Sequence, residues 1–142
     1  MTTHREARFI CASADAVFDL VADVERYPEF LPMWRQARVY QRQGDVYLTE
    51  QEIGLGPISE RFRTRTELRR PDRIDVTSDD VLFRAFHIRW GFQPVRSGCR
   101  ASIELTWEVR SWPLQAAIDL LLPTVARTMV DAFQRRAGQV ER

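Results

Sequence analysis

The sequence predicts an α+β fold in which a curved, seven-stranded antiparallel sheet wraps around a long C-terminal helix. Short alternations of apolar and polar residues fill positions 34–110, and a helical apolar stripe fills positions 113–137. One strand-like segment and two short helical segments precede them. A sheet and a helix of this kind can each bury one apolar face against the other.

The composition is that of a globular protein, and we treat residues 1–142 as a single domain. Hydrophobic residues make up 44% of the chain and charged residues 29%, which does not suit a disordered protein. Lys and Arg number 21 against 20 Asp and Glu, so the formal charge of +1 gives no general attraction for nucleic acid. DNA is therefore not an expected partner.

The N-terminal residues are polar and charged, and no run of about 18 apolar residues follows. This pattern predicts a cytoplasmic protein that is at most peripheral to the inner membrane. Cys11 and Cys99 lie far apart and form no pair with metal or redox spacing. We expect both cysteines to be small buried residues and expect no metal site.

Residues 5–12 predict the first strand, and Ser13 is a suitable N-cap for the helix that follows. Asp15 would lie near the positive end of that helix, whose apolar residues recur with helical spacing as far as Val24. Residues 25–32 contain two prolines and predict a second short helix that ends abruptly.

Six further strands are predicted between Trp34 and Arg110, because turn signals interrupt this region repeatedly. The signals are Gly44-Asp45, Gly54-Leu55-Gly56-Pro57, Pro71-Asp72 and Ser97-Gly98. Apolar residues alternate with polar residues in these strands, so one face of the sheet is expected to be buried and the other wet. Large aromatic side chains gather on the buried face.

The last helix is predicted over residues 113–137, with Pro113 in its first turn. Its apolar stripe consists of Ile118, Leu121, Leu122, Val125, Met129, Ala132 and Phe133. Pro123 removes a backbone donor from the middle of the helix, so we expect a kink near residues 119–123.

The segment from Val21 to Trp34, with Tyr27-Pro28-Glu29-Phe30-Leu31-Pro32 at its centre, resembles the signature of the coenzyme Q-binding branch of the START-like superfamily of polyketide cyclases and lipid transfer proteins. Residues 53–62, Trp90-x-Phe92-x-Pro94 and residues 129–133 also fit, so the resemblance spans nearly the whole chain. Members often carry a cysteine after the Leu-Pro pair, where this chain has Met33 and Trp34. Bacterial ribosome association toxins are relatives within this branch.

The resemblance implies a helix-grip fold with an elongated apolar cavity that holds a polyprenyl quinone. An excess of large aromatics on the predicted concave face supports such a cavity, since apolar ligand sites are lined in this way. Ordinary core packing is the alternative interpretation. The predicted ligand-binding residues are Phe30, Leu31, Phe62, Phe86, Trp90, Ile103, Trp107, Leu122, Val125 and Met129, as the walls of one continuous tunnel.

Phe30 and Leu31 are placed at the mouth of this tunnel. They belong to a proline-bounded apolar segment that would serve as a gate for ligand or membrane. The alternative is that residues 27–32 form only a rigid corner between helix and strand.

Arg61, Arg63 and Arg65 alternate on the predicted outer face of one strand, and Arg69, Arg70 and Arg73 follow near the next turn. One interpretation is a solvated face whose arginines pair across strands with Glu104 and Glu108. The other is a patch that binds phosphate groups of RNA or of lipid headgroups.

No catalytic residues are predicted. His4 falls in a terminus expected to fray and His87 faces outward, and no nucleophile motif or phosphate loop is present. Only Glu60 and Tyr40 are polar candidates near the pocket.

We therefore expect a non-enzymatic lipid carrier that requires no cofactor and binds a polyprenyl quinone such as ubiquinone, or a similar lipid. It would support respiration or quinone biosynthesis through transient contact with the inner membrane or with respiratory or biosynthetic proteins. Two alternatives stand beside this hypothesis. One is a ribosome-associated protein that acts through its arginine-rich face, and the other is an enzyme of the polyketide cyclase type.

Overall fold

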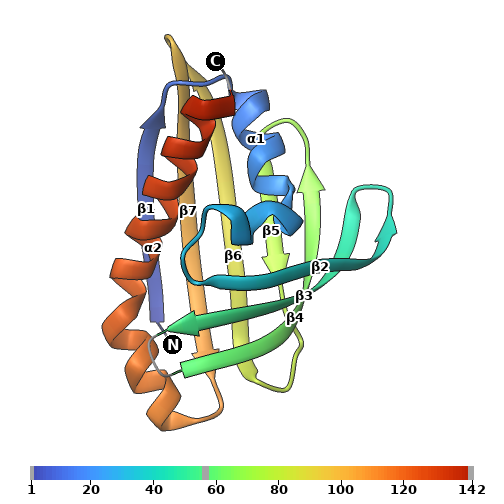
Figure 1. Ribbon diagram of the computed structural model, residues 1–142, viewed down its shortest axis with the longest axis vertical. Coiled ribbons are helices and arrows are strands. Elements are labelled where there is room, and N and C mark those ends of the chain that lie inside the picture. Colours follow the sequence, from blue (N-terminus) through green and yellow to red (C-terminus); the bar gives the residue numbers. More distant parts are fainter. Residues whose placement is uncertain (1, 56–57, 141–142) are drawn as a thin grey trace.

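A computed structural model describes residues 2–55 and 58–140 and confirms the predicted fold class. Seven antiparallel strands in the order β1-β7-β6-β5-β4-β3-β2 form a sheet that curves around the long helix α2 (Figure 1). The strands are β1 (Thr2–Ile10), β2 (Trp34–Gln43), β3 (Val46–Leu55), β4 (Ile58–Arg69), β5 (Arg73–Thr77), β6 (Phe83–Val95) and β7 (Gly98–Val109).

Two short helices separate β1 from β2, as predicted. The first is α1 (Ala14–Ala22), and the Ser13 hydroxyl accepts a hydrogen bond of 3.1 Å from the backbone N–H of Ala16. The second, η1 (Val24–Glu29), is a 3₁₀ helix. The hydroxyl of Tyr27 donates to the carbonyl of Val21, so η1 is tied back onto α1.

The predicted turns lie between the expected strands. Gly44 and Ser97 adopt positive φ angles of 61° and 70° at the tight turns before β3 and β7. Pro71 and Asp72 connect β4 to β5. The predicted turn between β3 and β4 includes Gly56 and Pro57, which lie outside the described residues.

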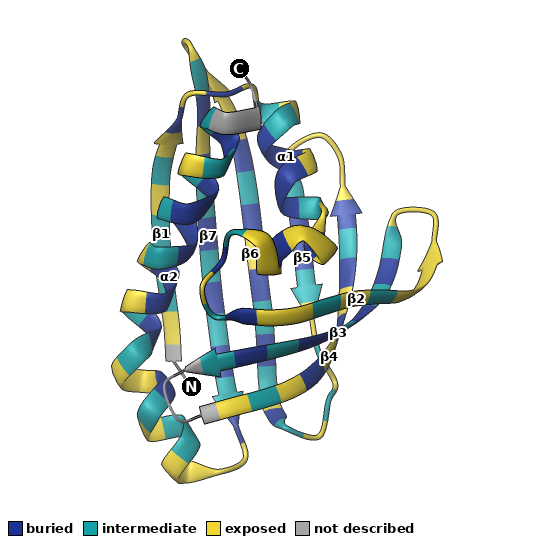
Figure 2. Ribbon diagram, viewed as in Figure 1, coloured by how far each residue is buried: buried dark blue, intermediate teal, exposed yellow. Residues whose placement is uncertain are grey.

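Helix α2 (Trp112–Val140) begins after Ser111, whose hydroxyl accepts a hydrogen bond of 3.4 Å from Leu114 N. It continues as one helix through Pro123 and packs mainly against β1 and β7. Its predicted apolar stripe faces the sheet, with Leu121 only partly buried and the other members buried (Figure 2).

Cys99 is buried in β7, as expected, but Cys11 is exposed. The prediction for Cys11 was wrong because this residue lies just beyond the end of β1, outside the alternation that buries Ile10. No described helix has both the length and the apolar character needed to cross a membrane.

Candidate functional site

An apolar void of about 30 Å³ lies between the concave face of the sheet and α2. Five of the predicted site residues line it, namely Phe62, Phe86, Trp90, Trp107 and Met129. Its other walls were not predicted from the sequence and are Val21, Val24, Tyr27, Trp34, Tyr47, Gln51, Ile53, Thr66, Ile74, Val76 and Ile88. The period-two pattern correctly indicated which strand residues face the helix.

A second void of about 40 Å³ lies toward the first turns of α2. Its walls are Ile53, Glu60, Phe62, Leu82, Phe83, Trp107, Val109, Leu114 and Ile118. Ile53, Phe62 and Trp107 border both voids, and we call these three residues the shared wall. Glu60 thus lies beside the interior, as expected.

The interior is divided where a continuous tunnel was predicted. Each void offers room for one or two water molecules, whereas pockets for drug-sized ligands are commonly about 300–1,000 Å³. Aromatic side chains pack closely around the first void. The rings of Phe86 and Trp107 are stacked, with their centroids 5.5 Å apart. The rings of Trp90 and Phe133 meet edge to face, with their centroids 5.2 Å apart.

The remaining predicted site residues do not line either void. Ile103, Leu122 and Val125 are buried in the core. Leu31 is only 1% exposed, and the ring of Phe30 packs 5.2 Å from that of Phe133. The rings of Tyr27 and Phe30 both pack against Phe133 of α2, so this segment forms no open mouth in the structure.

A buried polar chain forms part of the wall on the β2 and β3 side. Trp34 Nε1 donates to Gln51 Oε1 at 2.7 Å, and Gln51 Nε2 donates to Thr49 Oγ1 at 2.9 Å and to Thr64 Oγ1 at 3.2 Å. A signal for it exists in the sequence, because Thr49 and Gln51 alternate in register with the inward-facing Tyr47 and Ile53.

Two buried tyrosines beside the first void remain neutral hydrogen-bond donors. Burial raises the pKa of Tyr27 well above its ordinary value, and the nearby Tyr47 and Asp23 add to the effect. Burial likewise raises the pKa of Tyr47 to about 12, and its hydroxyl donates to the carbonyl of Ala22 at 2.6 Å. Neither group is available as a base near neutral pH.

Tyr40 lies outside the interior, so its expected position near the pocket was wrong. Its ring is 39% exposed, and the guanidinium carbons of Arg38 and Arg63 lie 5.7 Å and 5.6 Å from the ring centroid. His87 faces outward as predicted, whereas His4 lies within β1 and contacts Glu6 at 2.8 Å. Across residues 2–55 and 58–140, no group of His, Cys, Asp and Glu is arranged to hold a metal ion.

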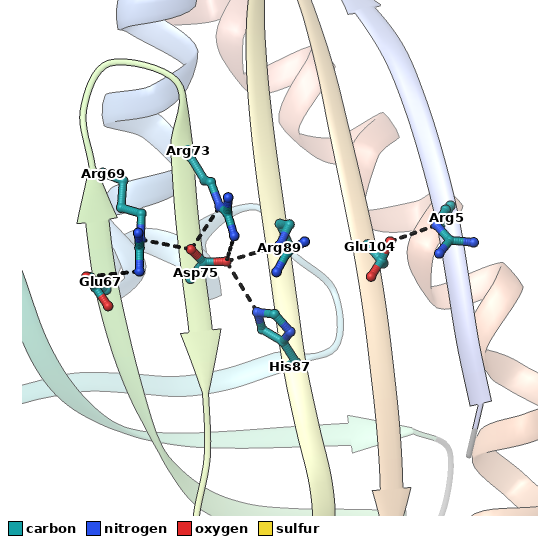
Figure 3. A network of polar contacts seen from close by, with 8 residues as sticks. All are labelled: Arg5, Glu67, Arg69, Arg73, Asp75, His87, Arg89 and Glu104. Carbon is teal, nitrogen blue, oxygen red and sulfur yellow. Dashed lines mark hydrogen bonds and ion pairs between the residues drawn. The ribbon is translucent and has the colours of Figure 1, made fainter.

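The outer face of the sheet carries a separate cluster centred on Asp75, which is 8% exposed (Figure 3). Asp75 oxygens lie 3.1 Å from Arg69 Nε, 3.0 Å from Arg73 Nε and 3.4 Å from Arg89 Nε. His87 Nε2 lies 3.2 Å from the same carboxylate. Burial opposes ionisation of Asp75, but the contacts with His87, Arg73 and Arg89 outweigh it, so its pKa lies below the ordinary value.

Two further carboxylates extend this cluster. Glu50 contacts arginines of β2 and β4, and Glu67 contacts two arginines of β4. Seven arginines therefore share three carboxylates, and we call them the arginine face: Arg38, Arg61, Arg63, Arg65, Arg69, Arg73 and Arg89.

The predicted pairing of Arg61, Arg63 and Arg65 with Glu104 and Glu108 was wrong. β4 lies between β3 and β5, whereas both glutamates are in β7. Glu104 pairs instead with Arg5 of β1 at 2.7 Å. Arg61 and Arg63 contact Glu50 on the adjacent strand β3, and Arg65 contacts Glu67 within β4.

The amino-acid sequence of the chain is similar to those of known proteins. The chain is 33% identical to the ribosome association toxin RatA of Pseudomonas aeruginosa over 99% of both chains. It is 26% identical to the mitochondrial coenzyme Q-binding protein COQ10 homolog B of Xenopus laevis, over 96% of this chain and 58% of that protein.

Among solved structures, the Zhui aromatase/cyclase from Streptomcyes sp. R1128 has the same fold, with a TM-score of 0.89 at 11% identity over 99% of this chain and 96% of that one. The family model for polyketide cyclase/dehydrase and lipid transport matches residues 10–134. The chain therefore belongs to the polyketide cyclase/dehydrase and lipid transport family.

Proposed function

We propose that the protein binds a polyprenyl quinone, or a similar apolar lipid, between the sheet and α2 and carries it without changing it chemically. The observation that supports this proposal is the shared wall, since Ile53, Phe62 and Trp107 each line both apolar voids. The family includes lipid transport proteins, and one relative is named for coenzyme Q binding. No cofactor and no catalytic step form part of the proposal.

Binding would require the interior to enlarge, because the voids are small beside an isoprenoid. Helix α2 packs mainly against β1 and β7, so the sheet can part from the helix on the β3 and β4 side without losing those contacts. Transfer of apolar surface out of water contributes about 25 cal/mol per Å². A long isoprenoid tail therefore supplies enough free energy to hold the interior open.

The direct test is extraction of the protein, purified from its native host, with organic solvent, followed by mass spectrometry. The expected result is a polyprenyl quinone in near-stoichiometric amount. Finding no lipid there, together with no quenching of tryptophan fluorescence by added ubiquinone, would contradict the proposal.

A matched pair of variants locates the site. Val76 lines the first void and is partly buried, whereas Val39 is partly buried in β2 and lines neither void. Val76→Phe is expected to fill the void and to weaken ubiquinone binding about tenfold or more, while Val39→Phe leaves it unchanged. Equal effects of both changes would place the ligand elsewhere.

Ribosome association is a second candidate function, and the arginine face favours it. A relative of matching length carries that function in its name. Arginine forks bind phosphate groups well, and here they outnumber the carboxylates that they contact. Ribosomal RNA would be the partner that such a face recognises.

Reversing the charges of Arg61 and Arg65 tests this second candidate. Both side chains are more than half exposed, so we expect Arg61→Glu with Arg65→Glu to change the free energy of unfolding by less than about 1 kcal/mol. Sedimentation with ribosomal subunits at physiological salt should be lost. The control is Arg127→Glu with Arg135→Glu, an equal charge change at exposed positions of α2. Retained sedimentation of the β4 variant would exclude this face.

A further inference from the structure

Trp107 contains an unusual buried group. Within the described part of the chain, its indole Nε1 is the one buried side-chain nitrogen or oxygen atom that has no hydrogen-bond partner. The residue as a whole is 5% exposed. An indole N–H can only donate, and a buried donor without an acceptor is unfavourable for folding. Buried unsatisfied groups are rare in native proteins, so this one calls for a physical explanation.

Other polar side chains around the same interior are satisfied. Trp34, also an indole, donates to Gln51, and Gln51 in turn donates to Thr49 and Thr64. The hydroxyls of Tyr27 and Tyr47 donate to backbone carbonyls. The unpaired donor of Trp107 is therefore a local feature and not a sign of generally poor hydrogen bonding.

The surroundings of Trp107 fix its position. Its ring stacks on that of Phe86 with an interplanar angle of 20°, and its backbone carbonyl accepts a hydrogen bond of 3.3 Å from Gln115 Nε2. Gln115 Oε1 also accepts from Val109 N at 2.6 Å, so this part of β7 is tied to the start of α2. A donor held in this way is preorganised for an acceptor that arrives later.

The acceptor for this donor has to come from what occupies the interior, because Trp107 borders both voids and no described group accepts from it. We propose that the Trp107 indole N–H is the polar anchor of the ligand site and donates to a carbonyl oxygen of an otherwise apolar molecule. The inference rests on the proposed function and adds the chemistry of the contact. A quinone ring carbonyl has the required character, whereas a pure isoprenoid hydrocarbon offers no acceptor.

The test compares Trp107→Phe with Trp90→Phe, since both residues line the first void and each change removes one indole N–H. The probes are a short-tail ubiquinone and squalene, which has no oxygen, measured by titration calorimetry. Trp107→Phe is expected to weaken ubiquinone binding about tenfold, the ratio that corresponds to one hydrogen bond, and to leave squalene binding unchanged. Trp90→Phe should affect both probes alike.

A second measurement reports on the bond itself. The ¹⁵N-edited resonance of the Trp107 indole, identified by its absence in Trp107→Phe, should move downfield when ubiquinone binds and stay in place with squalene. Without ligand, the variant should still fold, because removing the unpaired donor offsets part of the cost of the cavity that the smaller ring leaves.

The outcomes distinguish failure of the Trp107 anchor from failure of the proposed function. If ubiquinone binds the parent protein but its affinity is unchanged in Trp107→Phe and the resonance does not move, the anchor is refuted while the proposed function stands. If neither probe binds the parent protein, the proposed function fails and the anchor fails with it. An equal loss of affinity for both probes in Trp107→Phe would also refute the anchor, since it would indicate a packing role.

Discussion

Replacing Asp75 with Asn is expected to lower the free energy of unfolding by about 2–3 kcal/mol, because the variant leaves a cluster of cations without its buried counter-charge. Arg69, Arg73 and Arg89 all contact this carboxylate, and it is nearly buried. The three arginine side chains are 40–53% exposed, so solvent screens their charges. The loss of unfolding free energy is therefore smaller than for a fully buried ion pair. Urea unfolding at neutral pH measures the effect.

The same substitution has a pH signature. The pKa of the Asp75 carboxyl group lies below its ordinary value, because the contacts with His87 and Arg73 outweigh the effect of burial. Its contribution to stability is therefore complete above the ordinary carboxyl range and is lost as the pH falls through the lowered pKa. The stability difference between the parent protein and Asp75→Asn should narrow at acidic pH.

Glu104→Gln serves as the control for Asp75→Asn. Its pair with Arg5 joins neighbouring strands in the same way, but Arg5 is 75% exposed, so the expected loss is below about 1 kcal/mol. A loss as large as that of Asp75→Asn, or a difference for Asp75→Asn that does not change with pH, would contradict this account of the cluster.

Truncating Phe133 to Ala should destabilise the protein by about 3–5 kcal/mol. Phe133 is 1% exposed on α2, and its ring centroid lies 5.4 Å from that of Tyr27, 5.2 Å from that of Phe30 and 5.2 Å from that of Trp90. One side chain thus joins the helix to η1, to the residue after it and to β6. Its removal leaves a cavity among aromatic rings that cannot easily collapse.

Phe9→Ala provides the comparison for Phe133→Ala by urea unfolding. It removes the same atoms from a β1 position that is 47% exposed, and it should lower the free energy of unfolding by about 1 kcal/mol or less. Similar losses from both changes would show that Phe133 does not connect these elements as described.

The concave face of the sheet was predictable because side chains in a strand alternate strictly. Phe62 and Leu68 in β4 and Ile103 and Trp107 in β7 are buried as their period-two positions require. The same alternation places Thr49 inward, although a polar residue gives no hydrophobic signal of its burial.

Contacts between strands distant in sequence were not predictable from the pattern. Alternation shows that Arg61 and Glu104 both face outward, yet it gives no information on the order of strands across the sheet. In the sheet, two strands lie between β4 and β7. Arg61 therefore pairs with Glu50 of the neighbouring strand β3 instead. Ion-pair partners can be assigned only once the strand order is known.

The size of the interior was also beyond the reach of the sequence. Inward-facing aromatics line a tunnel or fill a core depending on how their rings pack, and such packing is fixed by rotamers and neighbouring volumes. Here the stacking of Phe86 on Trp107 closes space that the pattern alone would leave open. The residue types predicted the chemical nature of the interior, but not its volume.

Under the proposed function, the smallness of the two voids determines how quickly a ligand is exchanged. A molecule larger than one or two waters enters only after the interior has opened, so the association rate would level off at the opening rate as ligand concentration rises. Release requires the same opening, and residence time would therefore depend on the protein more than on the ligand. A carrier of this kind keeps its cargo in transit and exchanges it quickly only where contact with another surface promotes opening.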